Sequence, residues 1–393
     1  MDKEKLLKLA KEYQTPLYVF DADAFRERLK LVKEALGEKI RLCYSMKANP
    51  FLLACLPPEL GALEVCSPGE LTVCENAGAD LHRIIFSGVN KTQDCVDRAV
   101  MDGVEVFTVE SYLHIERIEK AAAAAGTTAD VLLRLTSDNQ FGLDEELLVK
   151  IASERANYPH VNIVGLHYFS GTLKKRTSLI GRELDKMAAL ADRLKEECGL
   201  TLTRMEYGPG LWIDYFGDEP YAAEEALLRE AAPLLRAMAE KYELTVEMGR
   251  FYTAPCGSYL TTVMDKKTNC GFHYAIVDGG LHQMNYDGQM KGTQVPEIRN
   301  LSSEGGESGT WCLCGSLCTP NDVLVRAAEM NEPALGDVLD FERTGAYSIN
   351  EGFAFLLSRD LPAVVIVSED KGAELVRGHI RLDPFNTPRA VLQ

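Results

Sequence analysis

Three short motifs, each directly after an apolar run, carry residue types that suit one covalent chemistry. Lys47 follows Cys43-Tyr44-Ser45-Met46, where burial would favour the neutral amine that a Schiff base requires. Gly208-Pro209-Gly210 can bring backbone N–H groups close to a phosphate. Glu247 can keep a pyridine nitrogen protonated, and Arg250 can reach a phosphate.

Each motif has a plainer explanation when it is taken alone. A lysine at a strand end often extends to solvent, and two glycines often form nothing more than a tight turn. An acid three residues before an arginine is commonly a structural ion pair. The combination of the three motifs therefore carries the interpretation, provided that the fold brings them together.

The elements that would position these motifs alternate regularly between residues 40 and 250. Short apolar runs are separated by stretches with helical spacing, and Gly126 and Gly199 stand where two helices should end. The eight runs are Ile40–Met46, Leu63–Cys66, Arg83–Phe86, Val104–Val109, Val131–Leu135, Ile163–Phe169, Thr203–Tyr207 and Leu244–Val246. Eight such units predict a (β/α)8 barrel, with an open doubly wound sheet as the alternative.

A barrel of this kind assembles its site at the C-terminal ends of the strands. Besides the three motifs, the run ends carry Arg134 and the segment His167-Tyr168-Phe169-Ser170-Gly171-Thr172. The cofactor-binding residues predicted within the barrel are Lys47, Arg134, His167, Phe169, Gly171, Thr172, Gly208, Gly210, Glu247 and Arg250.

The second half of the chain has a different pattern of predicted elements. From Tyr259 onward, short strands are separated by Gly, Pro, Asn and Asp, which predicts an all-β domain. We therefore expect a barrel domain at residues 25–255 and a β domain at residues 1–24 and 256–393, which the strand Leu17–Phe20 would join.

Composition excludes several classes of protein. A net charge of −17 without a clustered basic face argues against a nucleic-acid partner. The absence of an export signal or a long apolar run predicts a cytoplasmic protein without a membrane partner, in which the 11 cysteines are reduced. Cys312, Cys314 and Cys318 lack a second ligand pair, so we expect no metal.

Five motifs in order resemble those of the fold-type III decarboxylases that act on diaminopimelate, ornithine and arginine. They are Tyr44-Ser45-Met46-Lys47-Ala48-Asn49-Pro50, Gly208-Pro209-Gly210, Glu247-Met248-Gly249-Arg250, Cys314-Gly315-Ser316-Leu317-Cys318-Thr319-Pro320-Asn321-Asp322 and Gly345-Ala346-Tyr347. The resemblance spans nearly the whole chain and implies an alanine-racemase-like barrel, a C-terminal β domain and decarboxylation of an amino acid with pyridoxal 5'-phosphate.

The resemblance also assigns roles. Lys47 would hold the cofactor, Glu247 would face the pyridine nitrogen, and Tyr347 would help to bind the phosphate. Cys318 would be the second catalytic residue, supplied by the partner subunit, and it would protonate the substrate carbon after CO2 leaves. This arrangement implies a homodimer with shared active sites.

Three departures from the family pattern bear on the cofactor and the substrate. Phe169 stands where a histidine commonly stacks on the cofactor ring, and Pro209 and Met248 replace a usual glycine and proline. Thr319 stands where an acidic residue usually meets the distal ammonium of a diamino acid, and a hydroxyl cannot neutralise a buried ammonium. The residues expected to face the substrate are Thr319, Asp322, Asp278 and His282.

The Cys-Thr-Pro and Asp-Gly-Gly-x-His patterns are similar to the biosynthetic branch that includes the glutamyl-acyl-carrier-protein decarboxylase of butirosin assembly. An amino acid on an acyl carrier protein is therefore one expected substrate, and Lys174-Lys175-Arg176 would form the basic patch that meets an acidic carrier. The alternatives are a decarboxylase of free diaminopimelate, ornithine or lysine, and a racemase or non-catalytic cofactor-binding relative.

Overall fold

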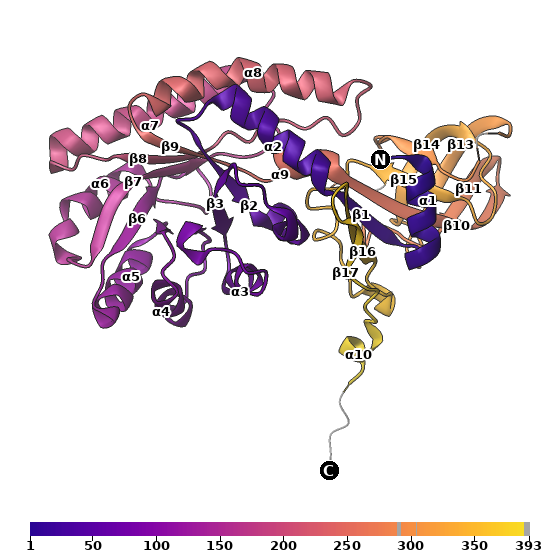
Figure 1. Cartoon of the computed structure of the whole chain (residues 1–393), viewed down its shortest axis with the longest axis horizontal. Coiled ribbons are helices and arrows are strands. Elements are labelled where there is room, and N and C mark those ends of the chain that lie inside the picture. Colours follow the sequence, from indigo (N-terminus) through magenta and orange to yellow (C-terminus); the bar gives the residue numbers. More distant parts are fainter. Residues whose placement is uncertain (289–291, 304, 389–393) are drawn as a thin grey trace, which may run out of the picture. The chain divides into compact units, whose positions relative to one another are not determined.

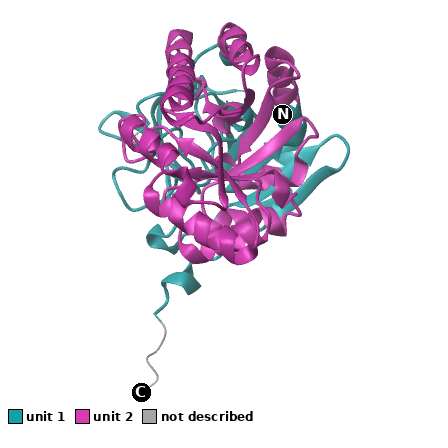
Figure 2. Ribbon diagram, turned by 90° about the vertical axis from the view of Figure 1, so that its left-hand side faces the viewer, with its two compact units in different colours: residues 1–26, 214–220, 252–393 teal, residues 27–213, 221–251 magenta. Residues whose placement is uncertain are grey.

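The computed structural model describes residues 1–288, 292–303 and 305–388. It divides into two compact units, which Figure 2 shows in different colours. One unit contains residues 27–213 and 221–251, and the other contains residues 1–26, 214–220 and 252–393. No helix in the described part of the chain combines the length and the apolar character that crossing a bilayer requires.

The first unit is a closed barrel of eight strands (Figure 1). The strands are β2 (Arg41–Ser45), β3 (Leu60–Val65), β4 (Ile84–Phe86), β5 (Val106–Val109), β6 (Ala129–Arg134), β7 (Val161–Phe169), β8 (Arg204–Gly208) and β9 (Glu243–Met248). Every neighbouring pair is parallel, and β2 closes the barrel by pairing with β9. The predicted barrel is confirmed, and the open doubly wound sheet is excluded.

Helices connect most of these strands and end where their sequences predict. They are α3 (Pro68–Asn76), α4 (Gln93–Met101), α5 (Tyr112–Ala125), α6 (Glu145–Ser153), α7 (Thr177–Cys198) and α8 (Pro220–Ala239), while α2 (Ala22–Leu36) precedes β2 and α9 (Arg250–Thr253) follows β9. Gly126 and Gly199 end α5 and α7 in the left-handed conformation, with φ of 65° and 64°, where a side chain would be strained.

The connection from β2 to β3 differs from the others because it consists of two 3₁₀ helices. They are η1 (Met46–Ala48) and η2 (Pro50–Cys55). Pro50 starts the second turn, and the Asn49 side chain caps it by accepting the N–H of Phe51. Lys47 therefore lies in the middle of a tight turn that begins directly after a buried strand.

Small and branched side chains fill the barrel interior below the strand ends. Cys43, Ala62, Ile85, Val106 and Leu132, from five successive strands, form one buried cluster. Layers of this kind turn the interior of an eight-stranded barrel into a packed core. Polar groups are consequently concentrated toward the C-terminal rim.

The second unit is built on a nine-stranded mixed sheet within the described residues. Its strands are β1 (Leu17–Asp21), β10 (Gly257–Asn269), β11 (Phe272–Val277), β12 (Ile298–Asn300), β13 (Ser308–Cys314), β14 (Val323–Asn331), β15 (Val338–Glu342), β16 (Ala363–Ser368) and β17 (Gly372–Arg377). The order is β14-β13-β11-β10-β1-β16-β17, and β15 joins β10 to β12. Helix α1 (Lys3–Tyr13) packs Leu6 and Leu9 against this sheet, and the short α10 (Asp383–Asn386) lies near the C-terminus.

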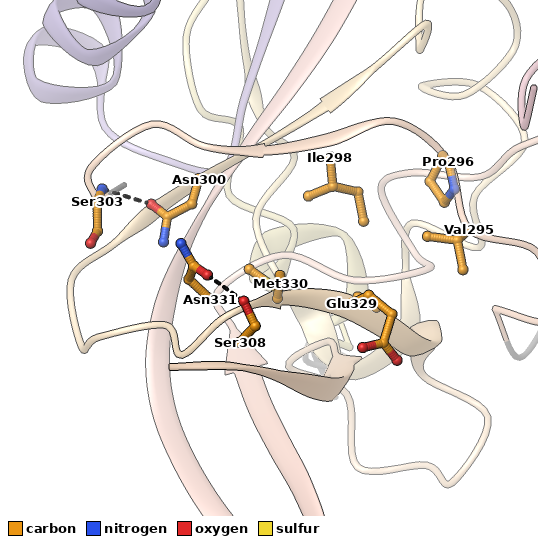
Figure 3. Close-up of a pocket in the computed structure, with 10 residues that line it drawn as sticks. Val295, Pro296, Ile298, Asn300, Ser303, Ser308, Glu329, Met330 and Asn331 are labelled. Carbon is orange, nitrogen blue, oxygen red and sulfur yellow. Dashed lines mark hydrogen bonds between the residues drawn. The ribbon is translucent and has the colours of Figure 1, made fainter. Parts of the chain in front are cut away.

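A pocket of about 470 Å³ lies between two edges of this sheet (Figure 3). Ile298 of β12 and Met330 of β14 are among its lining residues, and in the described sheet β12 pairs only with β15 and β14 only with β13. None of the residues predicted to bind cofactor or substrate lines this pocket.

Candidate active site

Lys47 is paired with a buried acid at the rim of the barrel. Its Nζ donates a hydrogen bond to Glu64 Oε2 and approaches Cys66 Sγ at 3.4 Å. The Cys66 thiol in turn donates to Glu64 Oε1 at 3.2 Å. The strand register explains the pairing, because Glu64 lies directly beside Ser45, two residues before the lysine. Lys47 keeps 37% of its side chain exposed, so its amine remains accessible to a ligand.

The electrostatics of Glu64 reflect two opposing effects. Burial acts to raise its pKa, but the Lys47 charge and the hydrogen bonds from Lys47 and Ser45 outweigh burial, so that the pKa falls to about 2. Glu64 is therefore a carboxylate at neutral pH, and its charge favours the protonated form of Lys47.

Phe169, Gly208 and Glu247 meet at the ends of three adjacent strands. A Cβ atom at Gly208 would lie 2.5 Å from Phe169 Cδ2 and 2.6 Å from Glu247 Oε1. Only glycine fits between these two side chains, so any larger residue at position 208 would have to displace the phenyl ring or the carboxylate.

The second glycine of the turn is required for a different reason. Gly210 has φ of +56°, and a Cβ atom there would lie 2.0 Å from the carbonyl oxygen of Gly171. Its own carbonyl oxygen accepts the N–H of Lys174 at 2.8 Å. The predicted segments around Gly171-Thr172 and Gly208–Gly210 are thus adjacent in the structure.

His167 and Glu247 lie close together below the rim. His167 Nε2 is 3.4 Å from Glu247 Oε1, and both side chains are buried. Glu206 joins them: one side-chain nitrogen or oxygen atom of each of the three lies within 4.8 Å of those of the other two. Glu247 Oε2 has no hydrogen-bond partner among the described residues, which leaves it able to accept a donor from a ligand.

The two predicted arginines are both buried at the rim. Arg134 donates to Glu110 Oε1 at 3.2 Å, and its guanidinium lies 4.8 Å from the centre of the Phe141 ring. Glu110 also accepts the N–H of Gly142 at 3.0 Å. Arg134 therefore helps to hold the β6–α6 connection, while Arg250 begins α9 directly after β9.

A second lysine, which is buried, lies in the connection between β4 and α4. Lys91 follows β4, is 1% exposed, and donates through Nζ to the carbonyl oxygen of Gly88. Burial lowers its pKa to about 8, although Glu110 acts in the opposite direction. Experiments on the cofactor lysine must therefore distinguish Lys91 from Lys47.

The residues at this rim fit pyridoxal phosphate. An accessible amine, a carboxylate oxygen without a partner in the described part of the chain, a phenyl ring and a glycine turn occupy the ends of neighbouring parallel strands. Lys47 would attach the aldehyde carbon, Glu247 would face the ring nitrogen, and Phe169 would flank the ring. The Gly208–Gly210 turn and Arg250 would face the phosphate.

The remaining predicted site residues belong to the β unit, where Cys318 lies exposed in a short loop. Asp322 ties this loop to the preceding one: Oδ2 accepts the N–H of Leu317 at 2.7 Å, and Oδ1 accepts the N–H of Leu281 at 2.8 Å. Burial raises the pKa of Asp322, although the two backbone N–H groups oppose this effect. Both of its oxygens serve to hold the loop that carries Cys318.

The other predicted substrate residues of the β unit, Asp278 and His282, differ in whether their side chains have hydrogen-bond partners. Asp278 accepts hydrogen bonds from Thr261 and Thr15. His282 is 2% exposed, and neither ring nitrogen has a partner among the described residues. Burial, aided by Arg359, lowers the His282 pKa to about 4, so the imidazole is neutral at physiological pH.

Thr319 and Tyr347 occupy turns of the β unit. Thr319 Oγ1 accepts the N–H of Asn321 at 3.4 Å, one residue after the exposed cysteine. Tyr347 has a positive φ of 62°, and its carbonyl oxygen accepts the N–H groups of Asn350 and Glu351.

The proposed basic patch is smaller than the sequence suggests. Lys174 is 9% exposed and forms an ion pair with Glu183 at 2.7 Å. Lys175 and Arg176 are exposed, and Lys175 Nζ lies 4.1 Å from the centre of the Trp212 ring. Two cations, rather than three, are thus available to a partner.

Sequence reasoning missed the acids that surround the site. Glu64, Glu110 and Glu206 stand within or directly after apolar runs, and each one is buried in the structure. A lone carboxylate near the C-terminal end of a buried parallel strand is the signal that could have identified them. Cys66 gave no comparable signal.

Comparison with known proteins supports the same interpretation. Residues 22–254 match the family model described as the pyridoxal binding domain of pyridoxal-dependent decarboxylases. An L-glutamyl-[BtrI acyl-carrier protein] decarboxylase from Niallia circulans is 27% identical, over 96% of this chain and 94% of the relative. A diaminopimelate decarboxylase from Methanocaldococcus jannaschii is also 27% identical, over 96% and 91%. The structure of the M. jannaschii diaminopimelate decarboxylase in complex with L-lysine matches with a TM-score of 0.84 at 25% identity, covering 95% of this chain and 92% of that one.

Proposed function

Because the chain belongs to the pyridoxal-dependent decarboxylase family, we propose that it removes the α-carboxylate of an amino acid that lacks a distal ammonium and is attached to an acyl carrier protein. The enzyme is a carboxy-lyase that uses pyridoxal phosphate. The nature of the amino acid and its attachment to a carrier are the proposed part.

Lys47 and Glu64 prepare the site for the cofactor. Lys47 Nζ must lose a proton before it can attack an aldehyde, and Glu64, which accepts a hydrogen bond from Lys47, holds the amine at the rim while stabilising its protonated form. When bound, pyridoxal phosphate supplies the electron sink for the bond that breaks between Cα and the carboxylate. Glu247 would keep the proton on the ring nitrogen that this sink requires, and Phe169 would flank the ring.

Cys318 is the proposed donor of the proton that replaces the carboxylate. Its Sγ is exposed at a loop whose backbone is fixed by Asp322, so the thiol has a defined position without being buried. We propose that it serves the site of a partner subunit in a homodimer. In this arrangement each barrel is completed by a neighbouring copy.

The loop chemistry supports a substrate without a distal ammonium, and this observation carries the proposal. Asp322 is the only acid in the segment Gly315–Asp322, and both of its side-chain oxygens accept backbone N–H groups. Thr319 offers only a hydroxyl next to the cysteine. A buried ammonium at this place would lose its hydration without gaining a charged partner, which costs several kcal/mol.

A carrier-linked substrate is supported by the exposed cations and by one of the relatives. Lys175 and Arg176 lie just before α7, close in sequence to the Gly171-Thr172 segment at the barrel rim. Two cations can attract an acidic carrier locally, although the net charge of −17 repels it at long range. The Niallia circulans relative is named as a decarboxylase of an L-glutamyl acyl-carrier protein.

Decarboxylation of free diaminopimelate is the second candidate, because several relatives of similar identity carry that name. A measurement of CO2 release separates the two. Glutamyl-carrier and other aminoacyl-carrier conjugates are compared with free glutamate, ornithine, lysine and diaminopimelate at equal concentration. The proposal predicts a far higher kcat/KM for a conjugate, and efficient turnover of free diaminopimelate would overturn it.

A further inference from the structure

Glu206 is a buried acid to which the proposed reaction assigns no role. It stands on β8, two residues before Gly208, and is 1% exposed. Neither carboxylate oxygen has a hydrogen-bond partner among the described residues. Two other buried acids of the barrel are hydrogen-bonded: Glu64 accepts from Lys47, and Glu110 accepts from Arg134.

The groups that face Glu206 come from several strands. His167 lies beside it in register on β7, and Glu247 projects from β9 into the same cluster. Glu64, Lys47, Arg41 and Cys43 also act on Glu206 electrostatically from β2, β3 and the turn after β2. None of these groups donates a hydrogen bond to Glu206 within the described structure.

An ionised carboxylate is expensive in such surroundings. Removing an ion from water without a hydrogen bond or a counter-charge costs several kcal/mol, whereas a protonated acid avoids most of this cost. Two carboxyl groups less than 5 Å apart also favour a state in which they hold one proton between them. The geometry therefore requires that one acid of the Glu206–Glu247 pair is neutral.

The surroundings decide which acid keeps the proton. Glu206 is 1% exposed, whereas Glu247 is 7% exposed and has His167 Nε2 at 3.4 Å from Oε1. Burial first, and then the charges of Glu247 and Glu64, raise the pKa of Glu206. Glu247 is consequently the better place for the negative charge.

We propose that Glu206 is a protonated carboxylic acid that acts as a positioning residue: it holds the one proton of the pair, so that Glu247 is the carboxylate presented to the ring nitrogen of the cofactor. The role of Glu247 in this statement rests on the proposed function. A second anion beneath the ring would compete for the ring proton and repel Glu247, and a neutral Glu206 prevents both effects.

Infrared spectroscopy of the apoenzyme tests the protonation state without cofactor or substrate. The spectrum of the wild type at neutral pH should contain a carboxylic-acid C=O band that is absent from Glu206→Gln. Glu224→Gln is the matched control, because Glu224 is 0% exposed but is paired with Arg28 at 2.6 Å and should contribute no such band. A spectrum of Glu206→Gln that keeps the full acid band would overturn the proposal.

A second measurement tests the coupling to Glu247. Removing the Glu247 charge should make Glu206 easier to ionise, so the acid band of Glu247→Gln should disappear at a lower pH than that of the wild type. An unchanged midpoint would contradict a shared proton. Both variants replace a carboxyl group by an amide of nearly the same shape, and circular dichroism checks that each one folds.

The affinity for pyridoxal phosphate tests the role of Glu206 separately from the proposed substrate. Since glutamine is neutral like a protonated acid, Glu206→Gln should change the dissociation constant for pyridoxal phosphate by less than about threefold. A tenfold or greater loss would show that a charged Glu206 is needed. These results do not depend on which amino acid is decarboxylated, so failure of the substrate proposal would leave them intact.

Discussion

The carboxylate of Glu64 accepts a hydrogen bond from the ammonium group of Lys47 while Glu64 itself is almost completely buried. The pair fixes the amine at the C-terminal rim of the barrel. It also stabilises the protonated form of the amine, which must lose its proton before the cofactor attaches. The interaction should therefore influence both the stability of the apoenzyme and the rate of cofactor loading.

We expect Glu64→Gln to weaken the pH dependence of apoenzyme stability. The folded-state pKa of Glu64 is lowered from 4.5 to about 2, so its contribution is present above pH 4.5 and is lost as the pH falls toward 2. The shift corresponds to about 3 kcal/mol at neutral pH. Urea unfolding between pH 3 and 7 measures this contribution. The difference in free energy of unfolding between the wild type and Glu64→Gln should be much smaller at pH 3 than at pH 7.

The same variant should load pyridoxal phosphate faster, because loss of the Glu64 charge removes the interaction that stabilises the protonated, unreactive form of Lys47. Stopped-flow absorbance after mixing apoenzyme with cofactor measures the loading rate. An identical loading rate and an identical stability curve would show that the pair has no functional part.

Cys318→Ala should retain cofactor binding but lose turnover, because the thiol acts after the carboxylate has left. Product analysis should also reveal a larger fraction of incorrectly protonated, transaminated product. Cys270→Ala is the control, since Cys270 is also exposed and lies in the turn between β10 and β11. An unchanged rate and product ratio in Cys318→Ala would remove the residue from the mechanism.

Mixing Cys318→Ala with Lys47→Ala subunits extends this prediction to the dimer. If each site takes its cysteine from the partner, hybrid dimers contain one intact site and should recover part of the activity. Recovery must follow subunit exchange, which native mass spectrometry can verify. Complete exchange without recovery would mean that each subunit is catalytically self-sufficient.

Asp322→Ala should destabilise the β unit and disorganise the loop of Cys318. It leaves the N–H groups of Leu281 and Leu317 without their acceptor, at a cost of about 2–4 kcal/mol. We expect a lower kcat with an unchanged cofactor absorbance, because the barrel is intact. Asn321→Ala, at an exposed neighbouring position, is the control, and equal effects of the two changes would refute the assigned role.

The barrel could be predicted because its eight strands are short, apolar and separated by helical spacing. The same pattern predicts where each strand ends, and it therefore identifies Lys47, Gly208 and Glu247 as residues at strand ends. The structure places these three residues on neighbouring strands at one rim. Periodicity thus gave the position of the site, since parallel strands always present the same end.

Partners across strands could not be predicted in this way. Glu64 and Glu206 lie inside runs, and a single sequence does not reveal which neighbours the register places beside them. The burial of Lys174 depends on Glu183, a residue of the following helix. Lys91 was overlooked because it stands five residues beyond its strand, where a turn folds it back into the barrel.

Charge reversal at Lys175 and Arg176 tests the carrier proposal. The double change to glutamate should raise the KM for a carrier-linked amino acid, with the largest effect at low salt, and leave slow turnover of a free amino acid unaltered. Lys195→Glu is the control, because Lys195 is exposed in the last turn of α7. A uniform effect on conjugated and free substrates would argue against carrier docking.

The central claim is that Lys47 carries the cofactor. Borohydride reduction of the holoenzyme fixes pyridoxal phosphate to its lysine, and peptide mass spectrometry then identifies that residue. We predict a label on Lys47 and its complete loss, together with the visible absorbance and turnover, in Lys47→Ala. Label on Lys91, or a coloured and active Lys47→Ala protein, would contradict the account.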